Sequence, residues 1–571
     1  MTVGNAMQAR LAGFARRAKG FVSQPEPRTI GRVASGKQLL SGNFIMAGSL
    51  VEAGGQSLFA LRMPTASFEA EAHGFAWLDD LAAVGTTEAR VLGQDWTVDW
   101  IARYGRGSGP GWEPDITGRR VIRWINHAID LLNGQTSRGS RRFFRTLSRQ
   151  VVFLSRRWQT TSPGLPRFEA LAGLTYAGLA LMGMERHMRA AVAALGRECD
   201  SQIDAEGGLP TRNPEELMQV FQLLVWAATA LKDREIEPAP GHLSAIERAA
   251  TTLRALRHAD GALARFHGGG RGLQGMLDVA LADSGIKSKP VEGRAMGFSR
   301  MSAGRTTILV DTAPPPEGKA AAEAHASTCA FELTSGRRPL IVSCGSGVNF
   351  GLDWRRAGRA TPSHSVLCLE GLSSARVVTA GPRRTPAAEF LTEGPSEVQY
   401  ARQRVYDGER LQVSHDAWRL SHGLSYARTL DLTMDGRAVV GEDLLMTLNQ
   451  ADKDTFARAL ALKPLGSFSF DVRFHLHPDA VASLDLNGTA VSITLKSGEV
   501  WVLRQDGAES MSVEPSVYLE RGRLKPRASE QIVLRKKTEE QAVRLRWSLA
   551  KAQETPLSVR DLDRGEDAAL G

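Results

Sequence analysis

The chain has 571 residues, more than one hydrophobic core usually supports, so we expect two or more domains. Its hydrophobic content of 42%, charged content of 23% and mean hydropathy of −0.21 are ordinary for a soluble protein and argue against wholesale disorder. No run of about 18 apolar residues occurs, so we expect no transmembrane segment. The net charge of +9 fits an anionic partner, but no zinc-ligand spacing, P-loop or Arg/Gly-rich tail singles out nucleic acid.

The first 25 residues are basic, with Arg10, Arg16, Arg17 and Lys19, but contain no continuous apolar core and no clear cleavage site. They lack the pattern of a secretory signal peptide, so we expect a cytoplasmic protein. The segment can form a short basic amphipathic helix, which is either solvated or in contact with anionic lipid. Residues 1–100 as a whole are predicted to be an N-terminal extension that packs on a helical domain through aromatic residues at 75–81 and 96–100.

Residues 101–290 are predicted to form the helical domain. Apolar residues recur at intervals of three and four in 121–134, and Gly134 fits a C-terminal stop. Segments with the same period follow at residues 143–158, 168–184, 216–231 and 243–257. Short turns rich in Gly and Pro separate them, which predicts helical hairpins, either closed into an α/α toroid or stacked in line.

Arginines recur at helical spacing in the second of these segments and alternate with Phe143 and Phe144. The stripe consists of Arg138, Arg142, Arg145, Arg149 and Arg156. It is either a solvated face or a surface for carboxylate, sulfate or phosphate groups on a polymer.

Beyond Lys287 the apolar period changes from 3.6 to 2, which is typical of β-strands. Short β-branched runs occur at residues 306–312, 330–334, 340–344, 365–369, 491–495, 500–504 and 542–547. An Asn-Gly pair at 487–488 fits a hairpin turn. Residues 291–560 are therefore predicted to form an antiparallel β-sandwich.

Four cysteines are too few for a disulfide framework in a chain of this length. They are Cys199, Cys329, Cys344 and Cys368. The last three have apolar neighbours, so we expect buried small hydrophobic side chains.

The most informative stretch begins at Glu323 and reads E-A-H-A-S-T-C-A-F-E-L-T, followed downstream by R-A-T-P-S-H-S ending at Ser365. It places His325 and His364 at predicted strand starts on either side of a glycine-rich turn, near several arginines. Glu323, two residues before His325, is predicted to lie on the same strand face.

This pattern resembles the C-terminal domain of the heparinase II/III family, polysaccharide lyases that cleave uronic-acid glycans. The two histidines match the family's histidines, and Ser343 stands where the family usually has an aspartate. The resemblance covers most of the chain and implies an α/α toroid followed by a β-sandwich. It also implies β-elimination on an acidic polysaccharide or oligosaccharide, and it makes the periplasm or cell envelope an alternative location.

The resemblance implies roles for particular residues. His325, His364, Glu323 and Arg212 are the catalytic candidates, with Arg212 neutralising the substrate carboxylate by its planar fork. Arg355 and Arg359 near His364, Arg167 and Asn213 in the helical half, and His267 beside three glycines are the substrate-binding candidates. Arg167 and Glu169 occupy the place where the family has an Asn-His-like pair. His325 and His364 are also candidate zinc ligands, although a third ligand is needed.

Two functions are consistent with these residues. The first is a lyase that acts on an acidic glycan between toroid and sandwich. The second is a non-catalytic glycan-binding or envelope-polysaccharide biogenesis protein that kept the fold. Ser343 favours it, as does the lack of the Asn and Tyr that the family usually has in its helical half: Asn213 has no tyrosine after it. A nucleic-acid-binding function rests on charge alone.

Overall fold

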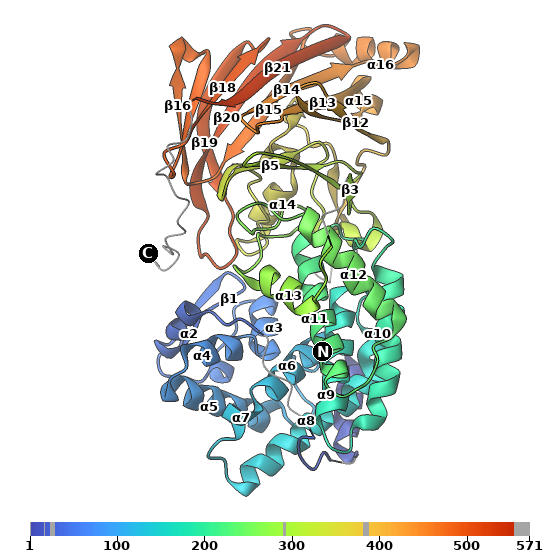
Figure 1. The fold of residues 1–571 in the computed structure, drawn as a ribbon, viewed down its shortest axis with the longest axis vertical. Helices are drawn as coiled ribbons and strands as arrows, with labels where there is room; N and C mark the ends of the chain where they lie inside the picture. Colours follow the sequence, from blue (N-terminus) through green and yellow to red (C-terminus); the bar gives the residue numbers. More distant parts are fainter. Residues whose placement is uncertain (1, 16, 23–28, 289–292, 381–387, 553–571) are drawn as a thin grey trace.

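The computed structural model describes residues 2–15, 17–22, 29–288, 293–380 and 388–552. Helices dominate up to Ser284 and antiparallel sheets dominate from Arg294 onward, which confirms the predicted toroid followed by a β-sandwich (Figure 1). The predicted boundary at residue 100 falls inside α5 (Thr87–Tyr104), while those at 290 and 560 lie outside the described residues.

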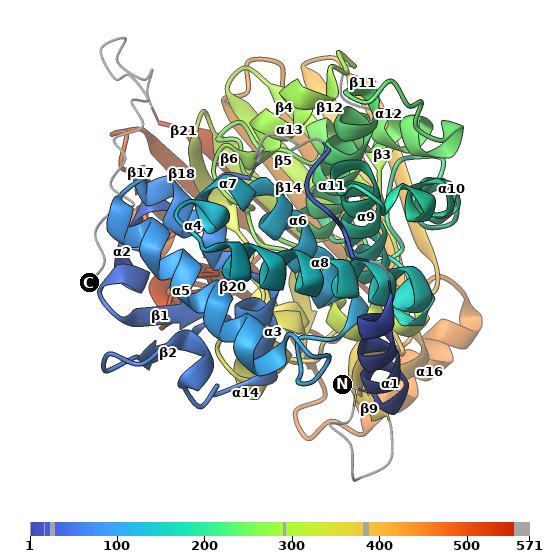
Figure 2. The same cartoon turned by 90° about the horizontal axis from the view of Figure 1, so that it is seen from below.

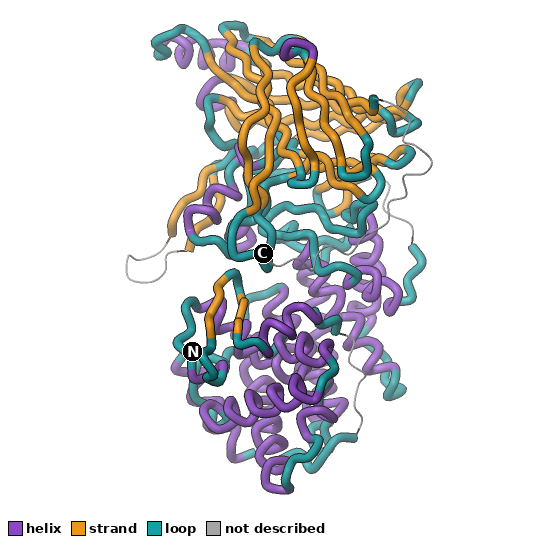
Figure 3. The backbone as a smooth tube through the Cα atoms, turned by 90° about the vertical axis from the view of Figure 1, so that its left-hand side faces the viewer, coloured by secondary structure: helices purple, strands orange, loops and turns teal. Residues whose placement is uncertain are grey.

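The helical domain is built from antiparallel helices joined by short turns (Figure 3). They are α1 (Val3–Leu11), α2 (Val33–Leu40), α3 (Ala66–Gly74), α4 (Trp77–Val84), α5, α6 (Pro114–Asn126), α7 (Ala128–Leu132), α8 (Ser137–Arg157), α9 (Leu165–Ala180), α10 (Met188–Gln202), α11 (Pro214–Lys232), α12 (Pro240–Ala255) and α13 (Met276–Ser284). A two-stranded hairpin of β1 (Asn43–Met46) and β2 (Ser49–Glu52) lies within the first hundred residues.

Two predicted helices have different limits in the structure. The segment 121–134 is interrupted at His127, whose φ of −100° and ψ of 20° are not helical, so it is divided between α6 and α7. The segment 168–184 ends at Ala180. No described helix is both long enough and apolar enough to cross a membrane.

Two glycines bring α6 and α9 unusually close together. A Cβ atom on Gly118 would lie 2.2 Å from the Glu169 carbonyl oxygen, and one on Gly173 would lie 2.6 Å from the Gly118 Cα. Aromatic residues of the first hundred then pack on α6: the rings of Phe75 and Trp100 each lie 5.6 Å from that of Trp124. The predicted aromatic contact between the N-terminal extension and the helical domain is therefore present.

The C-terminal domain has two main antiparallel sheets. One has the order β11-β12-β13-β14-β21-β18-β17-β16, and the other β19-β20-β15-β7-β6-β5-β4-β3, with β8 also paired to β15. The strands of the first are β11 (Val398–Val405), β12 (Gly408–Trp418), β13 (Leu424–Thr433), β14 (Ala438–Met446), β16 (Ala480–Asp485), β17 (Ala490–Leu495), β18 (Val500–Asp506) and β21 (Ala542–Lys551). Those of the second are β3 (Arg294–Ala295), β4 (Phe298–Ala303), β5 (Thr306–Asp311), β6 (Phe331–Ser335), β7 (Arg338–Val342), β8 (Leu367–Leu369), β15 (Phe468–Leu476), β19 (Ser510–Tyr518) and β20 (Arg527–Thr538).

The two sheets share a core, as a sandwich requires. Trp547 of β21 stacks on Phe331 of β6 at 5.8 Å and meets Phe474 of β15 edge-on at 4.9 Å. A small hairpin of β9 (Arg376–Ala380) and β10 (Ala388–Thr392) and the helices α14 (Leu352–Arg359), α15 (Arg419–His422) and α16 (Gln450–Ala461) complete the domain.

The segment between α12 and α13 contacts the sandwich and so connects the two domains non-covalently. Arg265 in this segment donates hydrogen bonds to the carbonyls of Ser343, Cys344 and Leu519 in the sandwich. His258, nearby, contacts Glu332 of β6 at 3.1 Å. These contacts place residues 265–270 against the histidines predicted from the sequence.

Candidate functional site

A cluster of three buried histidines lies where the two domains meet. His267 comes from the segment between α12 and α13, His325 from the loop before β6, and His364 from the turn before β8. The ring centres of His325 and His364 are 5.2 Å apart, and those of His267 and His325 are 6.1 Å apart. Each histidine is 1% exposed or less.

Hydrogen bonds fix the protonation of two of these rings. The Gly268 N–H donates to His325 Nε2 at 3.0 Å, and the His325 N–H donates to His267 Nδ1 at 3.1 Å. Each acceptor nitrogen must be unprotonated, so the ring proton lies on His325 Nδ1 and on His267 Nε2. His364 Nδ1 lies 3.0 Å from the Ser343 hydroxyl, so Ser343 contacts the cluster from the position where an aspartate was expected.

Asp311, at the end of β5, supplies the carboxylate of the cluster. Its Oδ2 lies 3.4 Å from His267 Nε2 and accepts a hydrogen bond from the Ser327 hydroxyl at 2.7 Å. Its Oδ1 accepts from Arg212 Nη2 at 2.5 Å. The side chain of Asp311 is fully buried.

Arg212 reaches from the helical domain and is fully used in holding the sandwich. Besides Asp311, it donates to the carbonyl oxygens of Met296 at 3.1 Å, Gly297 at 2.9 Å and Pro314 at 2.6 Å. Its guanidinium also lies 4.6 Å from the centre of the Phe298 ring. With its nitrogens committed in this way, Arg212 has no free edge for the bidentate binding of a substrate carboxylate.

Backbone strain accompanies these contacts. Arg212, His267 and Cys329 have φ values of +50°, +48° and +70°, in the left-handed region that costs about 1 kcal/mol or more for residues other than glycine. Surrounding hydrogen bonds hold all three residues in this strained conformation. The strained residues lie where the two domains meet.

The pKa values of the cluster follow from its burial. Burial is the largest cause that lowers the pKa of His325, and neighbouring His364 and His267 add to it. Burial likewise lowers the pKa of His364 to about 3. Burial alone would raise the pKa of Asp311, but Arg212 and His267 hold it below its usual value. The imidazoles are therefore neutral and the carboxylate is ionised at neutral pH.

This arrangement links residues of both domains, and two of its buried ring nitrogens, His325 Nδ1 and His364 Nε2, have no hydrogen-bond partner in the described structure. A general base works best with a pKa near the operating pH, and burial moves the pKa values of His325 and His364 below that range. For zinc, the candidate ligands His325 and His364 provide two nitrogens, and His325 Nε2 is occupied by Gly268. Among the described residues no group of three or more His, Cys, Asp and Glu side chains is arranged to hold a metal ion, so the residues present do not fit zinc.

Glu323 lies beside the cluster, where a Cβ atom on Gly268 would come within 2.8 Å of the Glu323 Cβ, but its predicted strand placement is wrong. It ends the 3₁₀ helix η5 (Gly318–Glu323), and His325 lies in the following loop, six residues before β6. Glu323 is 44% exposed and pairs with Arg355 at 2.7 Å. The short loop has no β-period, so residues 323 and 325 do not share a strand face.

The predicted substrate-binding residues are engaged in internal contacts. Arg355 also pairs with Glu389 at 3.4 Å, and the buried Arg359 donates to the carbonyls of Ala321 and Ala324. Arg167 pairs with Glu198 at 3.2 Å. The Asn213 side chain caps α11 by accepting from the N–H groups of Glu215 and Glu216. The structure thus brings Arg212, His267, His325 and His364 together. Glu323 and Asn213 lie against the adjoining Gly268 and Gly269, whereas Arg167 and Arg355 are held in ion pairs.

The sequence prediction missed Asp311. This residue ends a run of β-branched residues, and a charged residue closing a buried strand is a signal that would have found it. Glu169 was noticed in the sequence only by its place in the family's Asn-His-like pair, because its environment depends on the α6–α9 crossing. There it pairs with Arg119 of α6 at 3.2 Å, and burial raises its pKa to about 7.

We expect Glu169→Gln to gain stability over the unchanged chain as the pH rises. A pKa raised in the folded state means that ionisation destabilises the fold, so the cost appears above the unfolded value of 4.5 and is complete above about 7. The free energy of unfolding of the variant, relative to the unchanged chain, should rise by roughly 2 to 3 kcal/mol between pH 5 and pH 8. Urea denaturation at both pH values measures it, with exposed Glu88→Gln as the control. A difference that stays constant with pH would refute the assigned environment.

The cysteines and His475 lie outside the cluster. All four cysteines are free and buried, as predicted. The Nδ1 atom of His475 is hydrogen-bonded to the Ser516 hydroxyl at 2.8 Å and lies 3.5 Å from Cys344 Sγ.

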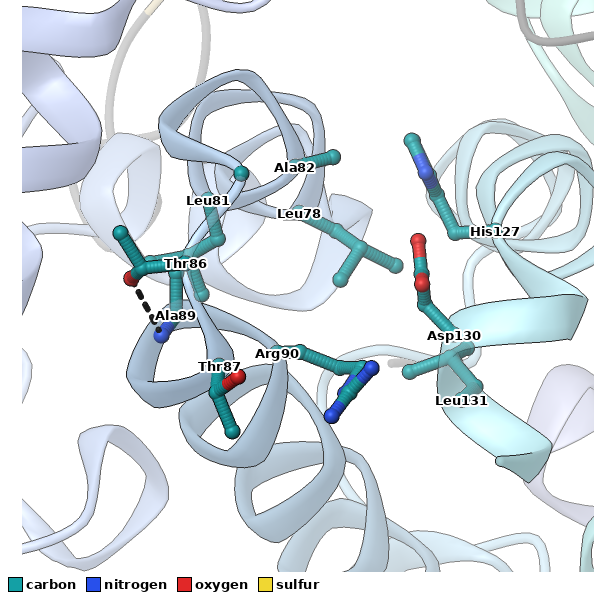
Figure 4. Close-up of a pocket in the computed structure, with 11 residues that line it drawn as sticks. Leu78, Leu81, Ala82, Thr86, Thr87, Ala89, Arg90, His127, Asp130 and Leu131 are labelled. Carbon is teal, nitrogen blue, oxygen red and sulfur yellow. Dashed lines mark hydrogen bonds between the residues drawn. The ribbon is translucent and has the colours of Figure 1, made fainter. Parts of the chain in front are cut away.

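A small hollow of about 120 Å³ between α4, α5 and α7 is lined by Leu78, Arg90, His127 and Asp130, among others (Figure 4). Its histidine is held by Asp79 at 2.8 Å, so the hollow presents no free base.

Comparison with known proteins agrees with the fold. Residues 286–548 match the family model described as heparinase II/III-like, C-terminal. The chain is also similar to solved lyase structures. Heparinase III aligns with a TM-score of 0.68 at 10% identity, over 96% of this chain and 89% of that one. Heparan sulfate lyase HepC from Pedobacter heparinus aligns with a TM-score of 0.57 at 14% identity, over 96% and 88%.

The chain belongs to the heparinase II/III-like family, and its architecture is that of a polysaccharide lyase. Likeness at 10–14% identity shows the fold alone. One curated relative is much closer in sequence: FtsZ-localized protein C of Caulobacter vibrioides is 31% identical over 543 residues, which cover 94% of this chain and 91% of the relative.

Proposed function

We propose that this chain is a non-catalytic member of the family, which uses the lyase fold as a binding scaffold and acts together with FtsZ. The observation that carries the proposal is the burial of His267, His325 and His364 around Asp311, each at 1% exposure or less. These groups are shielded from solvent in the described structure, and neutral imidazoles with lowered pKa values are poor bases at neutral pH.

The state of Arg212 supports the same conclusion. β-Elimination on a uronate requires a group that neutralises the C6 carboxylate so that the C5 proton becomes acidic. Arg212 was the candidate, but its guanidinium is bound by Asp311 and by the carbonyls of Met296, Gly297 and Pro314. Releasing it for substrate would leave the buried Asp311 carboxylate unpaired, which costs several kcal/mol.

The association with FtsZ is proposed from the relative's name and from the extent of the match. The match, at 31% identity over 94% of the chain, includes both domains, so the two proteins share their whole architecture rather than one module. The heparinase-like solved structures share the same architecture at 10–14% identity. The proposed location follows from this association alone, so the chain is proposed to act where FtsZ assembles, and the glycan-binding alternative becomes a property to test on the same protein.

Sedimentation with assembled FtsZ tests this proposal. The purified chain should appear in the pellet only when FtsZ polymers are present, while heparinase III, which has the same fold, should stay in the supernatant. If the two proteins partition alike, the proposed association is wrong.

A lyase reaction is the second candidate, and Glu169 is the observation that favours it. This side chain is 13% exposed, lies beside Arg119 and has a pKa raised by burial to about 7, which suits a general acid or base. It also occupies the place of the family's Asn-His-like pair. If the chain cleaves a uronate glycan, Glu169→Gln should lower the rate of cleavage by about 100-fold or more, whereas Glu88→Gln should leave the rate unchanged.

A further inference from the structure

The N-terminal helix α1 and the short 3₁₀ turn η1 (Ala12–Phe14) present an apolar face that nothing in the described structure covers. Val3 is 89% exposed, Met7 54%, Leu11 45% and Phe14 90%. Their spacing of four, four and three residues puts them on one side of the helical segment. We call these four residues the apolar face. Such a row is unusual on a folded protein, where exposed apolar side chains are normally scattered singly, and a contiguous exposed patch marks an interaction site.

The opposite side of the segment is fixed to the helical domain. Asn5, Ala9 and Ala12 are buried there. The Asn5 amide donates to Glu113 at 2.6 Å and accepts from Arg157 of α8 at 2.7 Å. Helix α1 therefore lies along the outside of the domain next to α8 (Figure 2), with its apolar face directed away from the protein.

Arginines surround one end of the apolar face. A hollow of about 370 Å³ is lined by Arg10, Arg17, Arg145 and Arg149 together with Gly13, Phe14 and Ala15. No ion pair among the described residues involves these four arginines. Arg149 donates to the Gly105 carbonyl. Burial lowers the pKa of Arg149, and the neighbouring cations Arg145 and Arg106 add to the effect.

The sequence around this surface also lacks acidic residues. Residues 1–25 contain no Asp or Glu, and neither does the whole of α8. The α8 arginines Arg138, Arg141 and Arg142 are exposed and extend the basic surface beyond the hollow. The predicted aromatic partners of the stripe are turned inward instead: Phe143 is buried and stacks on Trp124 at 5.1 Å.

We propose that α1, η1 and the neighbouring arginines form a peripheral docking surface for an anionic lipid bilayer. Charge complementarity selects this occupant: the arginines pair with lipid phosphate groups while Phe14 and the rest of the apolar face enter the boundary between headgroups and acyl chains. A soluble polyanion would use the arginines and leave the apolar face exposed to water. The combination of both features on one surface is what a bilayer satisfies.

Vesicle flotation of the full-length protein tests the proposal. The protein should float with vesicles of phosphatidylglycerol and phosphatidylcholine mixed equally, should stay behind with phosphatidylcholine alone, and should be released by high salt in part. The double variant Leu11→Ser/Phe14→Ser should bind about tenfold more weakly, since each change removes buried apolar area. Arg10→Gln and Arg17→Gln should each weaken binding by about fivefold.

The control is Leu420→Ser/Met434→Ser, which removes two apolar side chains that are 97% and 71% exposed on the sandwich. It should float like the unchanged chain. All these positions are exposed, so the variants are expected to fold, and thermal unfolding confirms it for each. The proposal is overturned if the unchanged chain does not float with anionic vesicles, or if the Leu11/Phe14 variant floats equally well. It is also overturned if light scattering shows a dimer that this variant dissociates, because the apolar face would then join two copies of the chain.

Discussion

Replacing Arg212 with methionine is expected to lower the free energy of unfolding by about 3 to 5 kcal/mol. The substitution keeps much of the side chain's length but removes the charge that faces Asp311 at 2.5 Å and the donors that hold the carbonyls of Met296, Gly297 and Pro314. The Asp311 carboxylate would then be buried and unpaired. Urea denaturation at pH 7 measures the change.

Two further variants show whether the unpaired carboxylate is the cause. Arg212→Met/Asp311→Asn should recover part of the loss, because the amide needs no counter-charge. Arg189→Met, at an exposed position of α10, should change stability by less than about 0.5 kcal/mol. A change below 1 kcal/mol for Arg212→Met would mean that this arginine does not hold the two domains together.

The sign of the pH dependence follows from the lowered pKa of Asp311. A carboxyl group whose folded pKa lies below its unfolded value contributes stability above the unfolded pKa and loses it as the pH falls through the folded value. The stability difference between the unchanged chain and Arg212→Met should therefore be largest near neutral pH. It should shrink in acid, where the carboxylate of the variant takes up a proton first.

Replacing Arg428 with methionine should destabilise the sandwich by a similar amount, about 3 to 5 kcal/mol. Arg428 of β13 is fully buried, with its Nε donating to Asp443 of β14 at 2.8 Å. It also donates to the carbonyls of Cys329 and Ser365, which lie in the segments that carry His325 and His364. Loss of this arginine therefore leaves a buried carboxylate and loosens the supports of the histidine cluster.

A surface pair on the same sheet provides the matched control. Arg410 of β12 pairs with Asp431 of β13 at 2.7 Å, with the two side chains 38% and 28% exposed. Arg410→Met should cost less than about 1 kcal/mol, because exposed ion pairs contribute little. Denaturation of both variants gives the comparison, and equal losses would contradict the importance given to burial.

Much of the architecture is predictable from the periods of the sequence. Segment 216–231 lies within α11, the run 306–312 contains β5, and the change of period after Lys287 marks the change from helices to strands. These signals are local, so the sequence carries them in full. The interruption at His127 was not predicted, because the apolar spacing continues across it.

The site was only partly predictable. The motif around His325 and His364 located two of the three histidines of the cluster, and the glycines beside His267 located the third. What the sequence did not show is the environment. The burial of these rings, the use of every Arg212 donor and the meeting of Asp311 with His267 depend on contacts between residues some 40 to 100 positions apart. Those contacts are the basis of the proposal that these groups hold two domains together.

The most direct test of the central claim is the ultraviolet absorbance of the purified full-length chain mixed with heparan sulfate, chondroitin sulfate and other uronate polysaccharides. Elimination creates an unsaturated uronate that absorbs, and heparan sulfate lyase HepC serves as the positive control. We predict no rise in absorbance for this chain under conditions where the lyase gives one. A rise that His325→Ala or His364→Ala abolishes, with the variants shown to be folded, would establish a catalytic histidine site and contradict the non-catalytic function proposed here.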